Sequence, residues 1–307
     1  MRKPILFLAL LSVAGSAWAG GQGTTAASFL QLDTSPRVVG MGDSFAGLAD
    51  DASAIEYNPA GQAYLTQKYL TVMDAVWFQD ITYQYGAIAW PFKFGTVSAD
   101  FFYLNAGTFQ GYTASGTPTG TFTAADMYGT LAYSRKILRN LSAGLSVKFL
   151  SESISTYSTS SVALGLSAFY QLPYPGLSLG MSLNNLGPSE GFQQGYALPL
   201  NLRMGVGYKP FDNIDCDIDY TQPNDTAGTL SLGGEYGYRA LVFRLGYKFQ
   251  GQADYNQTES GFGPAAAAGL NFGMGVKFFT NFTLDYSYSY YGFLGASQRF
   301  SLGAKFD

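Results

Sequence analysis

Apolar and polar residues alternate along most of the chain after residue 66. In the stretch NLSAGLSVKFL, Leu141 and Phe149 fall on one face of an extended strand, whereas Lys148 falls on the other. Successive side chains of a β-strand point to opposite sides of the sheet, so this period of two predicts strands with one apolar face and one polar or small face. The same alternation recurs in SVALGLSAFY, LNLRMGVGY, NIDCDIDY and ALVFRLGYKF.

The predicted strands are roughly 9–12 residues long, which suits a tilted crossing of a membrane. They cover residues 67–79, 81–91, 94–105, 125–138, 140–152, 160–172, 175–186, 199–209, 213–222, 228–237, 240–250, 265–279, 281–291 and 298–306. Short turns such as KILRN and LPYPG alternate with longer loops such as NAGTFQGYTASGTPTGTFTA and GQADYNQTESGFGP. An even strand number with short turns at one end is typical of outer-membrane barrels. The pattern therefore predicts an all-β fold, a transmembrane antiparallel β-barrel of about 14 strands with both ends on the periplasmic side.

The composition agrees with a membrane barrel. The chain is 47% hydrophobic and 16% aromatic but only 12% charged, whereas soluble domains carry about 25% charged residues. Aromatic residues such as Trp90, Phe92 and Phe94 lie at predicted strand ends, where barrels carry interfacial girdles. A soluble exported β-sandwich also alternates, so it is the alternative that strand length and turn asymmetry argue against.

The first 19 residues have the form of a secretory signal peptide. Arg2 and Lys3 precede an apolar run, and the AWA motif before Gly20 offers small residues for cleavage. A membrane anchor is the alternative, but the run is shorter than the ~20 residues that a spanning helix needs. The mature protein is therefore expected in the outer membrane of a Gram-negative-type (diderm) bacterium.

Charge and residue usage exclude several functions. Without Arg2 and Lys3 the chain has 15 basic and 21 acidic residues, a charge near −6, which argues against a nucleic-acid partner. The chain has no histidine, so a Ser-His or Asp-His mechanism is excluded, and no enzyme activity is predicted. A single cysteine, Cys216, allows no disulfide framework. No cofactor is expected.

Residues 20–66 do not alternate and instead space their apolar residues at a nearly helical period. Ser35 before Pro36, and Asn58 before Pro59, have the form of helix caps, and Asp50 or Asp51 could cap a further short helix. A barrel of about 14 strands has a lumen that must be filled, plugged or wet. Three parts are therefore predicted: a signal peptide (1–19), a helical hatch or plug in the lumen (20–66) and a transmembrane β-barrel (67–307).

The stretch FLQLDTSPRVVGMGDSFAGLADDASAIEYNPAGQAYL resembles the N-terminal signature of the PorV/PorQ family, within the FadL-like group of outer-membrane barrels. The matching elements are Phe29-Leu30, an arginine before Gly40-Met41-Gly42, the run AGLADDASA, and Asn58-Pro59-Ala60-Gly61. The similarity continues through WFQDITYQYGAIAWP, LPLNLRMGVGYKP and the final RFSLGAKF. Where family members have Ala-Arg, this chain has Pro36-Arg37.

The resemblance implies a fourteen-stranded barrel with an N-terminal hatch, surrounded by outer-membrane lipid. It further implies passage or binding of small hydrophobic molecules, such as fatty acids or hydrocarbons. The alternative is a PorV-like component of type IX secretion whose partner is secreted protein cargo. The residues that match the hatch signature, and that we expect to shape the plug, are Gly40, Met41, Gly42, Asp50, Asp51, Asn58, Pro59, Ala60 and Gly61.

Charged residues on the polar strand faces are predicted to point into the lumen, because a charge that faces lipid at mid-bilayer costs about 2–4 kcal/mol. They are Lys148, Arg203, Glu235, Arg244, Lys248, Lys277, Asp285, Arg299 and Lys305. One interpretation makes Arg203, Arg244 and Lys248 carboxylate holders for a fatty-acid-like ligand. The other, which inward charges in most barrels favour, is an ion-pair network between plug and barrel.

Metal binding is not predicted. Asp215, Asp217 and Asp219 offer the oxygen ligands that Ca²⁺ prefers. However, alternate residues of a strand lie ~7 Å apart, and no glycine-containing loop folds these three together. Asp50 and Asp51 are interpreted as helix-capping residues rather than as a catalytic pair.

Overall fold

The computed structural model describes residue 21 and residues 23–78, 81–249, 269–291 and 295–307. The predicted signal peptide and the loop GQADYNQTESGFGP lie outside these residues. Within the described ranges, no helix is both long enough and apolar enough to cross a membrane.

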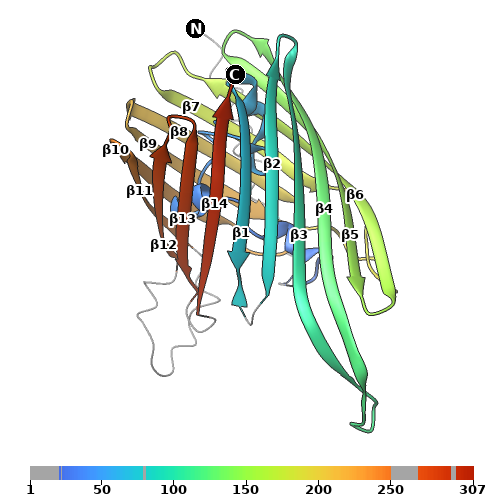
Figure 1. Ribbon diagram of the computed structural model, residues 1–307. Coiled ribbons are helices and arrows are strands. Elements are labelled where there is room, and N and C mark those ends of the chain that lie inside the picture. The colour runs from blue at the N-terminus through green and yellow to red at the C-terminus, as the bar shows by residue number, and fades with distance from the viewer. Residues whose placement is uncertain (1–20, 22, 79–80, 250–268, 292–294) are drawn as a thin grey trace.

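Fourteen antiparallel strands of the described chain form a closed barrel, in which β1 pairs with β14 and every other strand pairs with its neighbours in sequence (Figure 1). The strands are β1 (Lys68–Val76), β2 (Thr82–Phe92), β3 (Gly95–Tyr112), β4 (Pro118–Leu138), β5 (Leu141–Ile154), β6 (Tyr157–Gln171), β7 (Leu177–Leu186), β8 (Asn201–Phe211), β9 (Ile214–Pro223), β10 (Thr229–Tyr238), β11 (Leu241–Phe249), β12 (Leu270–Phe278), β13 (Phe282–Tyr290) and β14 (Ala296–Phe306). The predicted all-β barrel of about 14 strands is confirmed.

Strand β5 illustrates how the sequence pattern determines the two faces of the wall. Ser142, Ser146 and Lys148 are buried on the inner face, whereas Leu145 and Phe149 are 49% and 56% exposed on the outer face. Exposed leucine and phenylalanine side chains on every second position form the apolar outer surface that a barrel presents to lipid.

Aromatic side chains collect at the end of the barrel that carries the short turns. Trp90, Phe92 and Phe94 stack in sequence, with ring centroids 5.9 and 5.1 Å apart. On β12 and β13, Phe278 and Phe282 stack at 5.6 Å. This distribution matches the aromatic girdles that position barrels at membrane interfaces.

The hairpin β3–β4 differs from the prediction. The stretch NAGTFQGYTASGTPTGTFTA was expected to be a loop, but β3 has 18 residues and β4 has 21, so only residues 113–117 connect them. Thr108 pairs with Thr123, and Phe109 stacks on Phe122 at 5.6 Å. The loop prediction was wrong because the abundant Gly, Ser and Thr suggested a turn, although threonine and phenylalanine favour strands. The hairpin projects beyond the rest of the barrel (Figure 1).

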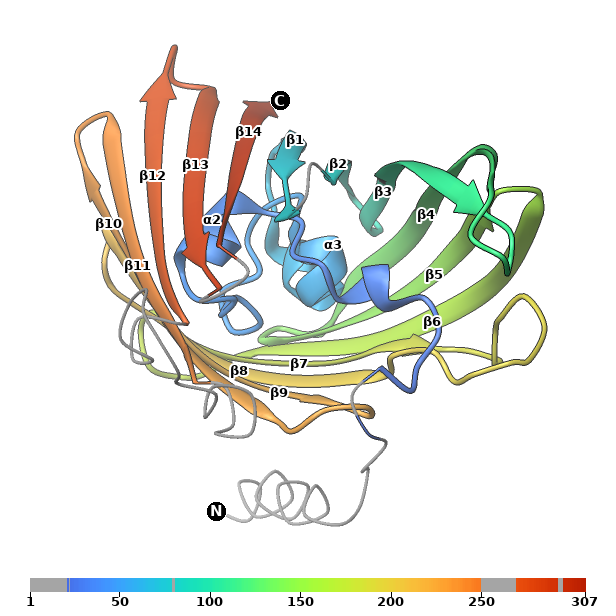
Figure 2. The same cartoon turned by 90° about the horizontal axis from the view of Figure 1, so that it is seen from below.

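Most of the N-terminal segment, residues 23–67, lies inside the barrel (Figure 2). It consists of short helical turns: η1 (Ser28–Gln31), α2 (Pro36–Gly40), α3 (Ala54–Tyr57) and η2 (Pro59–Tyr64). Helix α2 packs against β12 and β13, and η2 packs against β4 and β5. The segment therefore contacts opposite parts of the wall.

The predicted helix caps are met in part. Helix α2 begins at Pro36 after Ser35, but the Ser35 side chain makes no capping hydrogen bond. Asp51 does not precede a helix directly; it accepts a hydrogen bond from the Ser53 amide at 2.9 Å, just before α3. Asn58 caps η2, where its side chain accepts from the Ala60 amide at 3.2 Å.

Candidate functional site in the barrel lumen

On the side of β8 to β13, the backbone of the N-terminal segment lies directly against the backbone of the wall. A Cβ atom at Gly40 would lie 2.8 Å from the Gly273 Cα atom. Gly42 has a positive φ of 69° and would place a Cβ 2.7 Å from the Tyr247 amide nitrogen. Met41, between them, is fully buried. Glycine is required at both positions, because any side chain would separate the segment from the wall.

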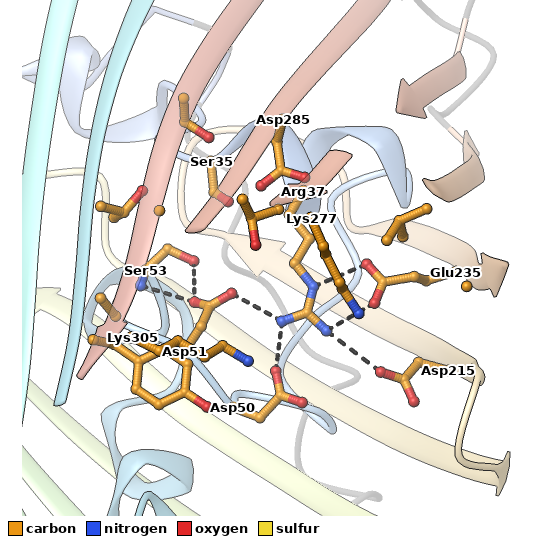
Figure 3. Close-up of a pocket in the computed structure, with 18 of the residues that line it drawn as sticks. Ser35, Arg37, Asp50, Asp51, Ser53, Asp215, Glu235, Lys277, Asp285 and Lys305 are labelled. Carbon is orange, nitrogen blue, oxygen red and sulfur yellow. Dashed lines mark hydrogen bonds and ion pairs between the residues drawn. The ribbon is translucent and has the colours of Figure 1, made fainter. Parts of the chain in front are cut away.

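Arg37 lies at the centre of a cluster of four carboxylates (Figure 3). Its Nη1 atom donates to Asp50 at 2.6 Å and to Asp51 at 2.9 Å, both within the N-terminal segment. Its Nε atom donates to Glu235 at 3.0 Å and its Nη2 atom to Asp215 at 3.4 Å, both on the wall. One guanidinium thus joins the segment to β9 and β10.

A second ion-pair cluster lies deeper in the lumen. Arg203 Nη2 donates to both carboxylate oxygens of Asp43 at 3.2 Å, and its Nη1 donates to Asp219 at 3.2 Å. Lys248 Nζ donates to Asp43 at 3.0 Å. Burial alone would raise the pKa of Asp43, but Arg203 and Lys248 outweigh it and lower the pKa to about 2. Asp43 is therefore ionised at neutral pH.

Three of the inward cations, Arg203, Arg244 and Lys248, form ion pairs with the chain's own carboxylates. Arg244 pairs with Glu235 and, at 2.6 Å, with Asp285. Together with Arg203 and Lys248, it was a candidate carboxylate holder for a ligand. All three form ion pairs with aspartate or glutamate.

On the side of β2 to β5, aromatic side chains replace these ion pairs. Phe29 of η1 lies against both Phe102 and Tyr128, with ring centroids 6.1 and 6.2 Å away. Phe102 stacks on Tyr128 at 4.9 Å and meets Tyr83 at 5.3 Å. These inward side chains are at most 4% exposed.

Arg299 of β14 is enclosed by this aromatic cluster and is fully buried. Its guanidinium lies 5.2 Å from the Trp77 ring centre, and its Nε donates to the Tyr83 hydroxyl at 2.8 Å. The nearest carboxylate, Asp33, lies 3.7 Å away. Cation–π contact with the Trp77 indole therefore helps to stabilise the buried charge of Arg299.

One ion pair also occurs among the aromatic residues. Glu56 of α3 accepts from Lys148 Nζ at 2.7 Å and from Thr130 at 3.3 Å, and Lys148 lies 4.2 Å from the Tyr128 ring centre. Burial would raise the pKa of Glu56, but Lys148 together with hydrogen bonds from Asp100 and Tyr128 outweighs burial and lowers it.

The Asn-Pro-Ala-Gly stretch lies against the inner wall at β5 and β6. Asn58 is fully buried and donates to the Ala46 carbonyl at 2.9 Å, which ties η2 to the preceding loop. Pro59 starts η2, and the Ala60 amide donates to the Ser167 hydroxyl at 3.1 Å. A side chain at Gly61 would collide with Ala49. These four residues fix the path of the segment.

Two cavities open toward the short-turn end. The first, of about 220 Å³, surrounds the Arg37 cluster and is the pocket of Figure 3. Its ionisable lining residues are Arg37, Asp50, Asp51, Asp212, Asp215, Glu235, Arg244, Lys277, Asp285 and Lys305. The second, of about 490 Å³, has a mainly apolar lining between η2 and the β6–β7 turn. Asp50 lines both cavities; burial would raise its pKa, but Arg37 and Lys209 outweigh burial and lower it.

The aspartates of β9 are divided among different partners. Asp215 joins the Arg37 cluster, and Asp219 accepts from the Phe45 and Ala46 amides at 2.9 and 3.0 Å. Among the described residues, no group of three or more acidic, histidine or cysteine side chains is arranged to hold a metal ion.

The partners within the N-terminal segment were missed by the sequence analysis. Arg37, Asp43 and Glu56 each form ion pairs with the wall, although none was named as a site residue. A usable signal was the charge of residues 20–66, which hold five acidic residues and one basic residue. This excess of negative charge complements the inward-facing cations predicted on the strands.

A family model described as "Uncharacterised protein family (UPF0164)" matches residues 12–183, more than half of the chain. The chain belongs to the UPF0164 family. This match does not confirm the PorV/PorQ resemblance. No curated protein matches the chain.

Solved structures share the fold of this UPF0164 member at low sequence identity. The Ralstonia pickettii toluene transporter TbuX has a TM-score of 0.61 at 13% identity, covering 89% of this chain and 98% of its own. The CymD monoaromatic hydrocarbon channel scores 0.59 at 13% identity, over 89% and 96%. A Pseudomonas aeruginosa FadL homologue scores 0.56 at 13% identity, over 89% and 98%. These similarities give the FadL-like barrel fold and give no support to the type IX secretion alternative.

Proposed function

We propose that this UPF0164 member is an outer-membrane barrel that binds small apolar molecules, of hydrocarbon or fatty-acid type, and lets them pass. The observation that carries the proposal is the aromatic cluster on the inner wall. Phe102, Tyr128 and Tyr83 point into the lumen; Phe102 and Tyr128 pack against Phe29, and Tyr83 packs against Phe102. An inner wall of this kind favours an apolar solute over a hydrated ion.

The fold supports the proposal independently. The similar structures include proteins named as a toluene transporter and a monoaromatic hydrocarbon channel. We propose the same class of activity for this chain as a hypothesis, because the chain shares the barrel fold with these proteins.

The N-terminal segment has the role of a hatch in this proposal. Residues 20–66 would block free diffusion through the barrel of residues 67–307, after removal of the signal peptide. The ion pairs of Arg37 and Arg203 hold the hatch on one side of the wall. The aromatic contacts of Phe29 on the other side can be exchanged for contacts with an apolar ligand, because dispersion contacts are not directional.

Uptake of labelled toluene and labelled oleate by bacteria that express the protein in their outer membrane tests the proposal. Expression should raise the uptake of at least one of them above that of cells with the empty vector. Trp77→Ala should lower this gain, because Trp77 contacts Arg299 and the aromatic cluster. Trp90→Ala is the matched control, since Trp90 lies on the outer surface. A barrel that is folded by heat-modifiable migration but gives no gain would refute the proposal.

A further inference from the structure

The larger cavity at the short-turn end differs from the aromatic cluster in position and from the Arg37 cavity in chemistry. It lies between the N-terminal segment and the β6–β7 turn, and its apolar lining includes Leu48, Tyr64, Phe169, Leu172, Tyr174 and Leu177. Tyr64 and Phe169 face each other with ring centroids 5.7 Å apart. Its volume of about 490 Å³ lies within the range of roughly 300–1,000 Å³ typical of small-molecule sites.

The charged groups that line this cavity are already paired, and the Lys136 ammonium, which contacts the lining residue Tyr64, lies 4.4 Å from the centre of that ring. Lys209 and Asp50 are its charged lining residues. Lys209 Nζ donates to Asp50 and, at 3.2 Å, to Asp215. An ionic ligand group would have to break these pairs, whereas an uncharged molecule would not.

Helix η2 separates this cavity from the aromatic cluster on β2 to β4. Gln62 is fully buried and donates to the Asp51 and Ala52 carbonyls, both at 3.0 Å. It also accepts from the Ser98 hydroxyl at 2.5 Å on β3. The buried polar contacts of η2 thus divide the lumen into two apolar regions.

We propose that the cavity between η2 and the β6–β7 turn, at the short-turn end of the barrel, is a second binding site. It takes an uncharged apolar molecule that contains one aromatic ring. This inference rests on the proposed function, since it assigns the same ligand class a second position. The aromatic lining favours ring stacking, and the occupied charges disfavour acids.

Two tyrosines of similar burial permit a matched test. Tyr64 lines the apolar cavity and Tyr69 lines the Arg37 cavity, and both are half-buried at the same end of the barrel. In a background with Trp77→Phe and Trp90→Phe, Tyr64→Trp or Tyr69→Trp provides a single fluorescent reporter in the mature chain. Bromobenzene quenches tryptophan on contact, and 4-bromobenzoate is its anionic counterpart.

The expected result is saturable quenching of the tryptophan at position 64 by bromobenzene, several-fold stronger than at position 69. Quenching by 4-bromobenzoate should be much weaker at both positions. Equal quenching at 64 and 69, or unsaturable quenching at 64, would overturn the second site. Equal effects of the two probes at position 64 would overturn the uncharged ligand class.

The uptake assay distinguishes this inference from the proposed function. If the wild-type protein takes up toluene but the reporter at position 64 is not preferentially quenched, the second site is wrong and the proposed function stands. Leu172→Asp would place a charge in the cavity and should weaken bromobenzene quenching at position 64. Thr283→Asp, in the Arg37 cavity, is its control and should leave that quenching unchanged.

Discussion

The two sides of the lumen hold the N-terminal segment by different physical means. Toward β8 to β13, glycine backbones touch the wall and Arg37 and Arg203 pair with carboxylates across the contact. Toward β2 to β5, Phe29 packs among aromatic rings. Ion pairs fix position and orientation, because a misplaced partner leaves a charge buried without compensation. Aromatic packing depends mainly on filled volume, so a ligand of suitable shape can replace it.

The largest effect is expected from breaking the ionic side at Arg203. Arg203→Met would leave Asp43 and Asp219 buried without their guanidinium partner. Removal of one partner of a buried pair costs about 3–5 kcal/mol. The free energy of unfolding, measured with guanidinium chloride, should fall by this amount. Arg139→Met, in an exposed short turn, should leave it unchanged; equal effects of both changes would contradict the comparison.

Glycine contacts should give the next largest effect. A methyl group at Gly246 would collide with the Gly42 backbone, whereas a methyl group at Gly234 would meet open space. Overpacking of this kind costs about 1–3 kcal/mol. Gly246→Ala should therefore lower the unfolding midpoint and expose the N-terminal segment to protease, and Gly234→Ala should do neither. Tolerance of Gly246→Ala would show that the segment is not seated against β11.

A smaller effect is expected on the aromatic side. Phe29→Leu keeps an apolar side chain among Phe102 and Tyr128, so its cost should be about 1 kcal/mol. Hydrogen exchange should increase in residues 23–34 and remain unchanged in residues 36–46. Loosening of both regions together would mean that the segment is held as one unit and that the two sides are not independent.

The sequence was sufficient to predict the barrel because its signal is local. Each strand shows its two faces within about ten residues, so the alternation around Lys148 and Arg203 predicts their inward direction. The pairing partners are not local: Arg203 meets Asp43 160 positions away in the chain. The hairpin β3–β4 was missed for a related reason, since Thr, Gly and Ser form either a loop or a paired strand according to what lies beside them.

The smallest expected effect is a difference in pH response between the two sides. Asp43 has a pKa of about 2, below its ordinary 3.8, so its contribution is complete above pH 4 and is lost only as the pH falls toward 2. Glu190, in the loop before β8, has its pKa raised to about 7 by burial and by Asp126. A carboxyl with a raised pKa binds its proton more tightly in the folded state, so stability falls as the pH rises from about 4.5 to 7.

This loop holds the start of the N-terminal segment. The Ala197 carbonyl accepts from the Ala26 amide at 3.0 Å, and Glu190 forms a β-bridge with Tyr196. Hydrogen exchange, corrected for intrinsic rates, should therefore show residues 23–31 slightly less protected at pH 8 than at pH 5, and residues 36–46 equally protected. Glu190→Gln should reduce the difference at residues 23–31, because glutamine cannot ionise, whereas the neighbouring carboxyls Asp126 and Glu152 remain. A pH response that is undiminished in this variant would show that Glu190 is not the titrating group, and one that extends to residues 36–46 would place the titrating group on the ionic side and contradict the comparison.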